Sequence, residues 1–184
     1  MLFGTETFEL TILEKIHNTL ACGFMDWLMK AFSIIGNAGF IWIVIALILI
    51  AVKKYRRTGF MMAAGLILGL IIGNLVLKNV IARPRPCWLD EGFSLLISKP
   101  ADYSFPSGHT LASFVSAFVL LGESKRLGIP ALILAILIAF SRMYLFVHFP
   151  TDILGGILLA WIIVFGMKIF LKWHKKRILR LRSE

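Results

Sequence analysis

Charged side chains are scarce in this sequence. Asp, Glu, Lys and Arg make up 16% of its 184 residues, hydrophobic types make up 59%, and the mean hydropathy is +0.85. Soluble domains carry about a quarter charged residues, and a chain this small cannot bury the apolar surplus in one core. The composition therefore excludes an ordinary soluble domain and predicts an integral membrane protein.

Acidic residues are few as well: the sequence has ten Asp and Glu but 20 Lys and Arg, so its net charge is +10. Such an excess can indicate nucleic-acid binding, but the basic residues cluster beside hydrophobic runs, at 53–57, 125–126 and 168–182. Basic loops and tails of this kind stay in the cytoplasm. We therefore expect no nucleic-acid partner and a cytoplasmic C-terminal tail.

Cysteine is almost absent, and Cys22 and Cys87 match no metal-binding or redox spacing. We expect both to act as small apolar residues. The first residues include Glu6 and Glu9 and no basic cluster, so no cleavable signal peptide is expected. Without repeats or low-complexity tracts, the chain is predicted to form a single membrane-embedded domain over 1–184, with an N-terminal region 1–36, a core 37–172 and a basic tail 173–184.

Uncharged stretches predict the membrane spans. They cover residues 31–52, 58–77, 103–122, 127–141 and 153–167, and the last two lengthen if they extend to 147 and 171. A helix needs about 20 residues to cross a bilayer. The predicted fold is an all-α integral membrane protein with a bundle of five or six transmembrane helices and an amphipathic N-terminal segment.

The first 36 residues decide between five and six spans. Phe8, Ile12, Ile16 and Leu20 recur at four-residue spacing, and Glu9 belongs to the polar positions between them. This periodicity predicts an amphipathic helix in the membrane interface. Residues 22–35 are apolar but include two charges, so the segment crosses the membrane, re-enters it or lies in the interface, and we favour the interface.

The unusual polar residues gather at one predicted membrane face. If the basic loops are cytoplasmic, the outward ends of the spans bring together Lys78, Arg83, Arg85, Ser107, His109, Arg142, His148 and Asp152. Ionisable groups at such positions indicate a functional site. Because these cations would repel one another, the site needs an anion, and phosphate suits the donors of Arg and Lys.

A helix N-terminus and two histidines complete the predicted site. Ser107 and Gly108 begin the third span, where free backbone N–H groups attract an anion and glycine permits close approach. His148 is the better nucleophile, because Asp152, in the first turn after Pro150, can fix its tautomer. His109 then remains as the general acid. The alternatives are that Ser107 only caps its helix and that Arg142 only extends toward the interface.

These residues resemble the three motifs of the type 2 phosphatidic-acid phosphatase superfamily, which is related to vanadium haloperoxidases. Residues 78–86 read K-x6-R-P, 106–109 read P-S-G-H, and 141–152 read S-R-x5-H-x3-D. Three motifs in order are far more specific than P-S-G-H alone. The chain looks similar to compact bacterial members that act on undecaprenyl diphosphate or phosphatidylglycerol phosphate.

The resemblance implies a metal-independent, two-step hydrolysis through a phosphohistidine, with no cofactor. By matching position, His148 is the nucleophile, Asp152 its partner and His109 the acid. The residues implied to bind phosphate are Lys78, Arg85, Ser107, Gly108 and Arg142. The spacing from Lys78 selects Arg85 over Arg83, which is expected to strengthen the positive field.

The expected substrate is a lipid phosphate or diphosphate in the membrane, processed on the extracytoplasmic side. By analogy with the family, we favour undecaprenyl diphosphate over phosphatidylglycerol phosphate or phosphatidate. A lipid phosphotransferase is an alternative within catalysis, and a lipid-binding or transport protein is an alternative outside it. The sequence leaves the oligomeric state open.

Overall fold

A computed structural model describes residues 4–90 and 92–181, and within these ranges all regular structure is helical. The expected all-α class is confirmed. In chain order the elements are α1 (Glu6–Leu20), α2 (Gly23–Ile35), η1 (Asn37–Gly39), α3 (Phe40–Ala51), η2 (Lys53–Tyr55), α4 (Arg56–Gly69), the π-helix η3 (Leu70–Leu77), α5 (Lys78–Ile81), α6 (Pro86–Leu89), α7 (Gly108–Glu123), α8 (Lys125–Tyr144) and α9 (Pro150–Leu181).

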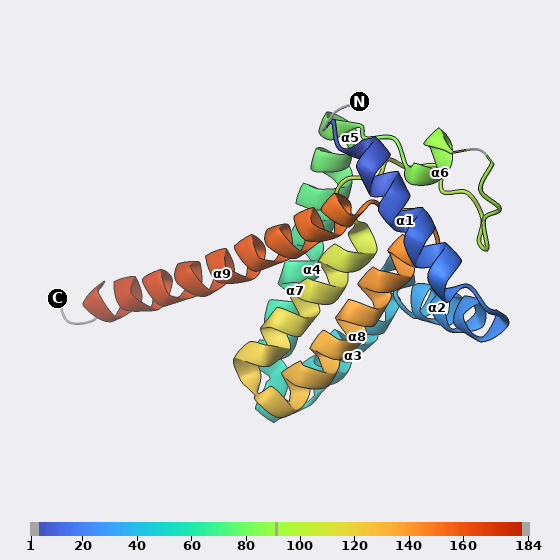
Figure 1. The fold of residues 1–184 in the computed structure, drawn as a ribbon. Coiled ribbons are helices and arrows are strands. Elements are labelled where there is room, and N and C mark those ends of the chain that lie inside the picture. The colour runs from blue at the N-terminus through green and yellow to red at the C-terminus, as the bar shows by residue number, and fades with distance from the viewer. Residues whose placement is uncertain (1–3, 91, 182–184) are drawn as a thin grey trace.

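Helix α7 lies at the centre of the bundle, packed against α8, α9 and α4 (Figure 1). Its buried positions include several small residues, among them Ser113, Ser116 and Ala117. Small side chains let neighbouring helices approach closely. Trp42 of α3 uses this space, because its indole N–H donates a hydrogen bond to the Ser113 hydroxyl at 2.9 Å.

Glycines play the same part on the helical run 53–89. A Cβ atom at Gly59 would lie 2.6 Å from the backbone nitrogen of Ile50, and one at Gly73 would lie 2.3 Å from Leu111 Cδ2. Neither distance leaves room for a side chain. These glycines therefore set how closely the run packs against α3 and α7.

The outer surface of the bundle is apolar, as a lipid-facing surface must be. Ile48, Phe60, Ile133 and Leu158, each from a different helix, are all more than half exposed. Three helical runs among the described residues are long and apolar enough to cross a membrane: 53–89, 125–144 and 150–178. The pair α2 and α3, bent by 42°, forms a fourth if it is one broken span, and α7 is shorter. The predicted count of five or six is not confirmed.

Several predicted boundaries are wrong. The stretch 31–52 is divided because Ala38 and Gly39 have positive φ angles of 51° and 68° between α2 and α3. The uncharged stretch 103–122 begins too early, since residues 103–107 form a loop, whereas the predicted helix start at Ser107 and Gly108 agrees with α7. Helix α8 ends at Tyr144 instead of continuing to 147, and Phe146 in the following turn has φ 59°.

The N-terminal helix has the predicted extent but not the predicted orientation. In Figure 1, α1 lies across the end of the bundle that also carries α5 and α6. Glu9 is buried, whereas Phe8 is 70% exposed. The spacing of apolar residues predicted that Glu9 faces water, and this is wrong because the Glu9 carboxylate is bound inside the protein by Arg83 and Thr151.

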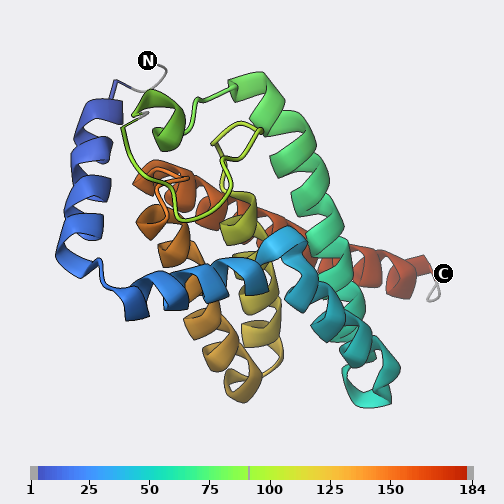
Figure 2. The same cartoon turned by 90° about the vertical axis from the view of Figure 1, so that its right-hand side faces the viewer.

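The predicted basic tail is largely a continuation of α9. Figures 1 and 2 show this helix extending well beyond the bundle. It reaches Leu181, so the start of the predicted tail at 173 is helical. Residues 182–184 of the predicted tail lie outside the described residues.

Candidate active site

The structure brings the predicted site residues together around one cavity of about 940 Å³. Six of them line it: Lys78, Arg85, Gly108, His109, Arg142 and His148. They come from α5, the loop before α6, α7, α8 and the turn before α9. Asp152 and Ser107 lie behind this lining, fully buried.

His148 lies in the tight turn between α8 and α9 and is 1% exposed. Arg85 Nη1 lies 3.1 Å from His148 Nε2, and His148 Nδ1 lies 3.4 Å from Asp152 Oδ2. Because arginine can only donate, Nε2 is the acceptor and the proton resides on Nδ1. The ring thus directs its Nε2 lone pair at Arg85 in the cavity lining and its Nδ1–H at Asp152, and the roles of both residues in a reaction remain predictions.

The surroundings of His148 disfavour its protonation. Burial, followed by the positive charges of Arg85, Arg142 and Lys78 and by the neighbouring His109, lowers the pKa of His148 well below its ordinary value. A neutral imidazole in a cationic cavity is suited to attack phosphorus.

Several donors hold Asp152 in place. Its Oδ2 accepts hydrogen bonds from the backbone N–H of Phe149 at 2.8 Å and from the hydroxyl of Ser104. Arg83 Nη1 donates to its Oδ1 at 2.7 Å. Ser104 Oγ also lies 3.4 Å from His148 Nδ1. Sequence reasoning missed Ser104, which belongs to no motif.

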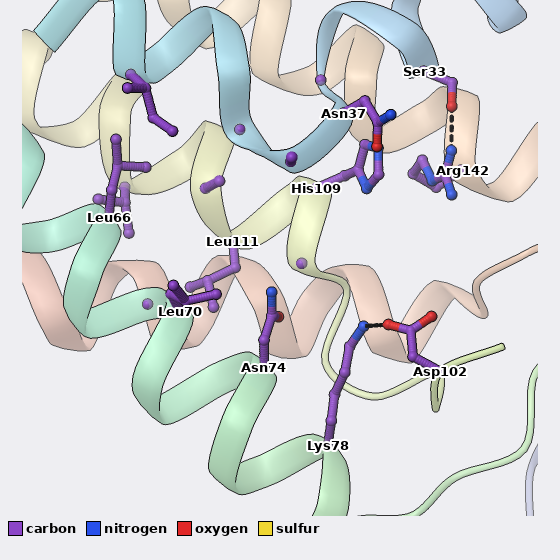
Figure 3. Close-up of a pocket in the computed structure, with 18 of the residues that line it drawn as sticks. Ser33, Asn37, Leu66, Leu70, Asn74, Lys78, Asp102, His109, Leu111 and Arg142 are labelled. Atoms are coloured by element: carbon purple, nitrogen blue, oxygen red, sulfur yellow. Dashed lines mark hydrogen bonds and ion pairs between the residues drawn. The ribbon is translucent and has the colours of Figure 1, made fainter. Parts of the chain in front are cut away.

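The cavity also contains an acidic side chain that no sequence motif indicated. Asp102 accepts hydrogen bonds from Arg85 Nη2 at 2.6 Å and from Lys78 Nζ, and Figure 3 shows it facing Lys78. Burial raises the pKa of Asp102, but the bond to Lys78 and the charges of Arg85 and Lys78 outweigh it and lower the pKa to about 2. Its carboxylate therefore occupies the position of an anion between two cations.

Arg142 and His109 line the opposite side of the cavity from Lys78 (Figure 3). Arg142 Nη1 donates to the hydroxyl of Ser33, while its buried Nε has no hydrogen-bond partner among the described residues. His109 packs against the break between α2 and α3, where a Cβ atom at Gly36 would lie 3.1 Å from His109 Cδ2. The two side chains add a cation and a titratable ring to the site.

Ser107 caps helix α7, which is the alternative role that the sequence indicated for it. Its Oγ accepts a hydrogen bond from Thr110 Oγ1 at 3.0 Å and caps α7 through Thr110 N at 3.4 Å. Gly108 lines the cavity, and a Cβ atom there would lie 2.9 Å from Asn74 Oδ1. Contacts of Ser107 and Gly108 with phosphate remain predictions.

Arg83 corrects a prediction. It does not strengthen the positive field of the cavity, because it is fully buried and paired with Glu9 at 2.6 Å and Asp152 at 2.7 Å. Arg85 is the arginine that faces the cavity, as the motif spacing indicated. Cys22 and Cys87 are free thiols and do not pair.

Away from the charged end, the cavity continues as an apolar arm between α3, α4 and α7. Its walls include Leu47, Leu66, Leu70, Leu111 and Ala112. Figure 3 shows Leu66, Leu70 and Leu111 along this arm. The site thus joins a charged compartment to an apolar one, a combination suited to an amphiphile.

Comparison with known proteins gives concordant matches. The PAP2 superfamily matches residues 54–177. The chain is 33% identical over 169 residues to an undecaprenyl-diphosphatase of Sulfolobus acidocaldarius, covering 91% of this chain and 78% of that one. It is 32% identical over 163 residues to phosphatidylglycerophosphatase B of Bacillus subtilis, covering 80% and 75%. The crystal structure of a transmembrane PAP2-type phosphatidylglycerolphosphate phosphatase from Bacillus subtilis aligns with a TM-score of 0.75 and 26% identity, covering 92% and 87%.

Proposed function

Because this chain belongs to the PAP2 superfamily and is a membrane-embedded lipid phosphatase of that type, we propose that it hydrolyses a lipid phosphate or diphosphate through a phosphohistidine on His148. One observation carries the proposal: His148 Nε2 faces Arg85 while Nδ1 faces Asp152. That arrangement places a nucleophilic lone pair beside cations that bind phosphate oxygens.

In the first step, Lys78, Arg85 and Arg142 bind the phosphate oxygens together with the N-terminus of α7 around Gly108. Arg85 transfers its hydrogen bond from His148 Nε2 to a phosphate oxygen, the freed Nε2 lone pair attacks phosphorus, and the bond from phosphorus to the lipid oxygen breaks. His109 donates a proton to the departing oxygen. Asp152 accepts the Nδ1–H hydrogen bond and stabilises the positive charge that develops on the ring.

In the second step, water replaces the lipid. His109, now neutral, takes a proton from a water molecule, whose oxygen attacks the phosphorus of the phosphohistidine. The bond from phosphorus to Nε2 breaks, inorganic phosphate leaves, and His148 recovers its lone pair. The three cations neutralise the phosphoryl charge that metal ions neutralise in other phosphatases, so the reaction is proposed to need neither metal nor cofactor.

Undecaprenyl diphosphate is the proposed substrate. The apolar arm provides surroundings for a prenyl chain, and the charged end provides cations for a diphosphate. The similarity to an undecaprenyl-diphosphatase over most of both chains supports this choice. Phosphatidylglycerol phosphate is the second candidate, favoured by the structural similarity to a phosphatase of that lipid.

We place the site on the extracytoplasmic side. The turns that carry the basic clusters 53–57 and 125–126 lie at the end of the bundle away from α1 and α6 (Figure 1). Basic loops favour the cytoplasm. The tail from 173 is proposed to be cytoplasmic, and the whole chain to be one membrane-embedded domain.

Phosphate release from a panel of purified lipids tests the proposal. We expect release from undecaprenyl diphosphate to exceed that from phosphatidylglycerol phosphate and phosphatidate, and His148→Ala to abolish it while the protein stays folded in detergent. His174→Ala, on the exposed end of α9, is the matched control and should keep full activity. EDTA should leave the rate unchanged. Undiminished turnover by His148→Ala, or a strict requirement for divalent metal, would contradict the mechanism.

A further inference from the structure

We propose that Glu9, on the first helix, is a positioning residue that holds Asp152, and through it His148, by way of Arg83 and Thr151. This inference rests on the proposed function, because it assigns Glu9 to the same reaction. Glu9 belongs to none of the three motifs, and its helix was expected to lie in the membrane interface with this side chain in water.

Both carboxylate oxygens of Glu9 accept hydrogen bonds from buried or partly buried donors. The side chain is buried at 3% exposure, and burying a carboxylate is costly unless it is fully hydrogen bonded. Oε1 accepts from the backbone N–H of Thr151 at 2.9 Å and from its hydroxyl at 2.8 Å. Oε2 accepts from Arg83 Nη2 at 2.6 Å and from the hydroxyl of Thr5 at 2.9 Å.

Arg83 connects Glu9 to the carboxylate beside His148. Its Nη1 donates to Asp152 Oδ1 at 2.7 Å and to Thr151 Oγ1 at 2.6 Å, while Nη2 serves Glu9. Its guanidinium also stacks over the ring of Phe149, 4.1 Å from the ring centre. With no exposed surface, the side chain is fixed between the two acids.

Two physical effects follow from this arrangement. First, Arg83 divides its charge between two carboxylates, so Asp152 keeps more negative charge for the Nδ1–H of His148 than it would in a simple ion pair. Second, Glu9 satisfies the N–H of Thr151 in the first turn of α9, where backbone donors have no partner within the helix. Since Asp152 is the next residue, this bond also fixes the backbone position from which the Asp152 side chain extends.

Glu9 and Arg83 do not line the cavity. A change at Glu9 should therefore alter how well His148 attacks without altering how phosphate and lipid bind. The expected signature is a loss in kcat with KM preserved.

Steady-state kinetics of the full chain in detergent, with the lipid that the wild type hydrolyses best, tests this inference. Glu9→Gln keeps the shape and removes the charge, and we expect kcat to fall about 10- to 100-fold, as for loss of other groups that orient a reacting residue. KM and the inhibition constant for inorganic phosphate should stay within about twofold. Glu14→Gln, on the exposed face of the same helix, is the matched control and should match the wild type.

A double-mutant cycle separates positioning from general damage. In an Asp152→Asn background, Glu9→Gln should have no further effect on kcat, because the residue through which Glu9 acts is already neutral. Thr151→Val keeps the shape but removes the bridging hydroxyl, and it should lower kcat with KM unchanged. This variant replaces Glu9→Gln as the test if Glu9→Gln does not fold.

Three results would overturn the inference. The first is wild-type kcat in Glu9→Gln, and the second is an equal loss with and without the Asp152→Asn change. The third is a rise in KM that accounts for the whole defect. Each leaves the proposed function standing, because the wild type remains active, whereas a wild type that releases no phosphate from any lipid would overturn both.

Discussion

At the scale of single residues, Asp102 is the least expected group in the site. Its carboxylate binds Lys78 and Arg85, the same cations that are proposed to bind phosphate. The side chain is 57% exposed, so it can leave without crossing a packed core. The substrate must therefore displace it to reach both cations.

Asp102→Asn should tighten phosphate binding, because the competing negative charge is removed while the side-chain shape is kept. We expect the inhibition constant for inorganic phosphate to fall about tenfold. Asp90→Asn, in the same connection but outside the cavity lining, is the control and should leave the constant unchanged. Weaker inhibition of Asp102→Asn by phosphate would show that Asp102 supports phosphate binding instead of competing with it.

The pH dependence of the reaction follows from His148. Because burial and the cations lower its pKa below the ordinary value of about 6.5, the ring stays neutral as the pH falls through 6.5. Asp102, with a pKa of about 2, stays charged over the same range and adds no pH dependence. After correction for the substrate's own ionisation near pH 6, we expect no loss of kcat/KM as the pH falls from 8 to 6, because His148 stays neutral and the proposed general acid, His109, must be protonated to act. A loss centred at 6.5 in the corrected profile would contradict a buried neutral His148.

At the scale of elements, the break between α2 and α3 packs against His109, the proposed general acid. Gly36 is buried there, and a Cβ atom at this position would lie 2.7 Å from Ile138 Cγ2 and 3.1 Å from His109 Cδ2. The break thus brings α2 against α8 and the start of α7. Ser33, less than one turn before the break, binds Arg142.

Gly36→Ala should displace the His109 ring and lower kcat about tenfold, within the range that a small displacement of a reacting group produces. Gly23→Ala, where a Cβ atom meets nothing within 4 Å, should leave kcat unchanged. Phosphate release measured for both variants tests whether the break sets the position of His109. Equal activity of the two would mean that the position of His109 does not depend on this break.

The elements also show what the sequence could and could not predict. Charge-free stretches located α3, α4, α8 and α9, because a bilayer requires such runs. The stretches extended too far, into the loop 103–107 and into the first residues of the turn 145–149, because uncharged residues there pack into the site instead of continuing a helix. For α1, periodicity predicted the helix but assigned Glu9 to water, because no local pattern reveals Arg83 and Thr151 as its partners.

The same contrast applies to the site. Motif spacing was sufficient to select Arg85 over Arg83 and to place Asp152 beside His148, because both relations are local. Ser104 and Asp102 could not be found in this way. Each meets its partner through the folding of a connection that has no periodicity, and the pairing with Lys78 spans 24 residues.

At the scale of the whole molecule, the cavity is a charged pocket with an apolar arm between α3, α4 and α7. We propose that the charged end carries out the reaction and that the arm selects the lipid. Chain length should therefore be selected in the arm, far from the reacting atoms.

Ala63→Phe, which places a ring in the arm, should lower kcat/KM for a long-chain prenyl diphosphate about tenfold and leave a short-chain prenyl diphosphate nearly unaffected. Ala64→Phe, the exposed neighbour on the same helix, should affect neither. Competition between the two lipids measures the selectivity directly. If Ala63→Phe impairs both substrates equally, the arm does not hold the prenyl chain.

The most direct test of the mechanism is to trap the phosphoenzyme. Rapid quenching with a lipid diphosphate labelled in its terminal phosphate should yield an acid-labile, base-stable phosphoprotein whose label maps to His148. The label should form equally in EDTA and be absent from His148→Ala. Label on any other residue, or full turnover by a chain in which His148 is never labelled, would contradict nucleophilic attack by this imidazole.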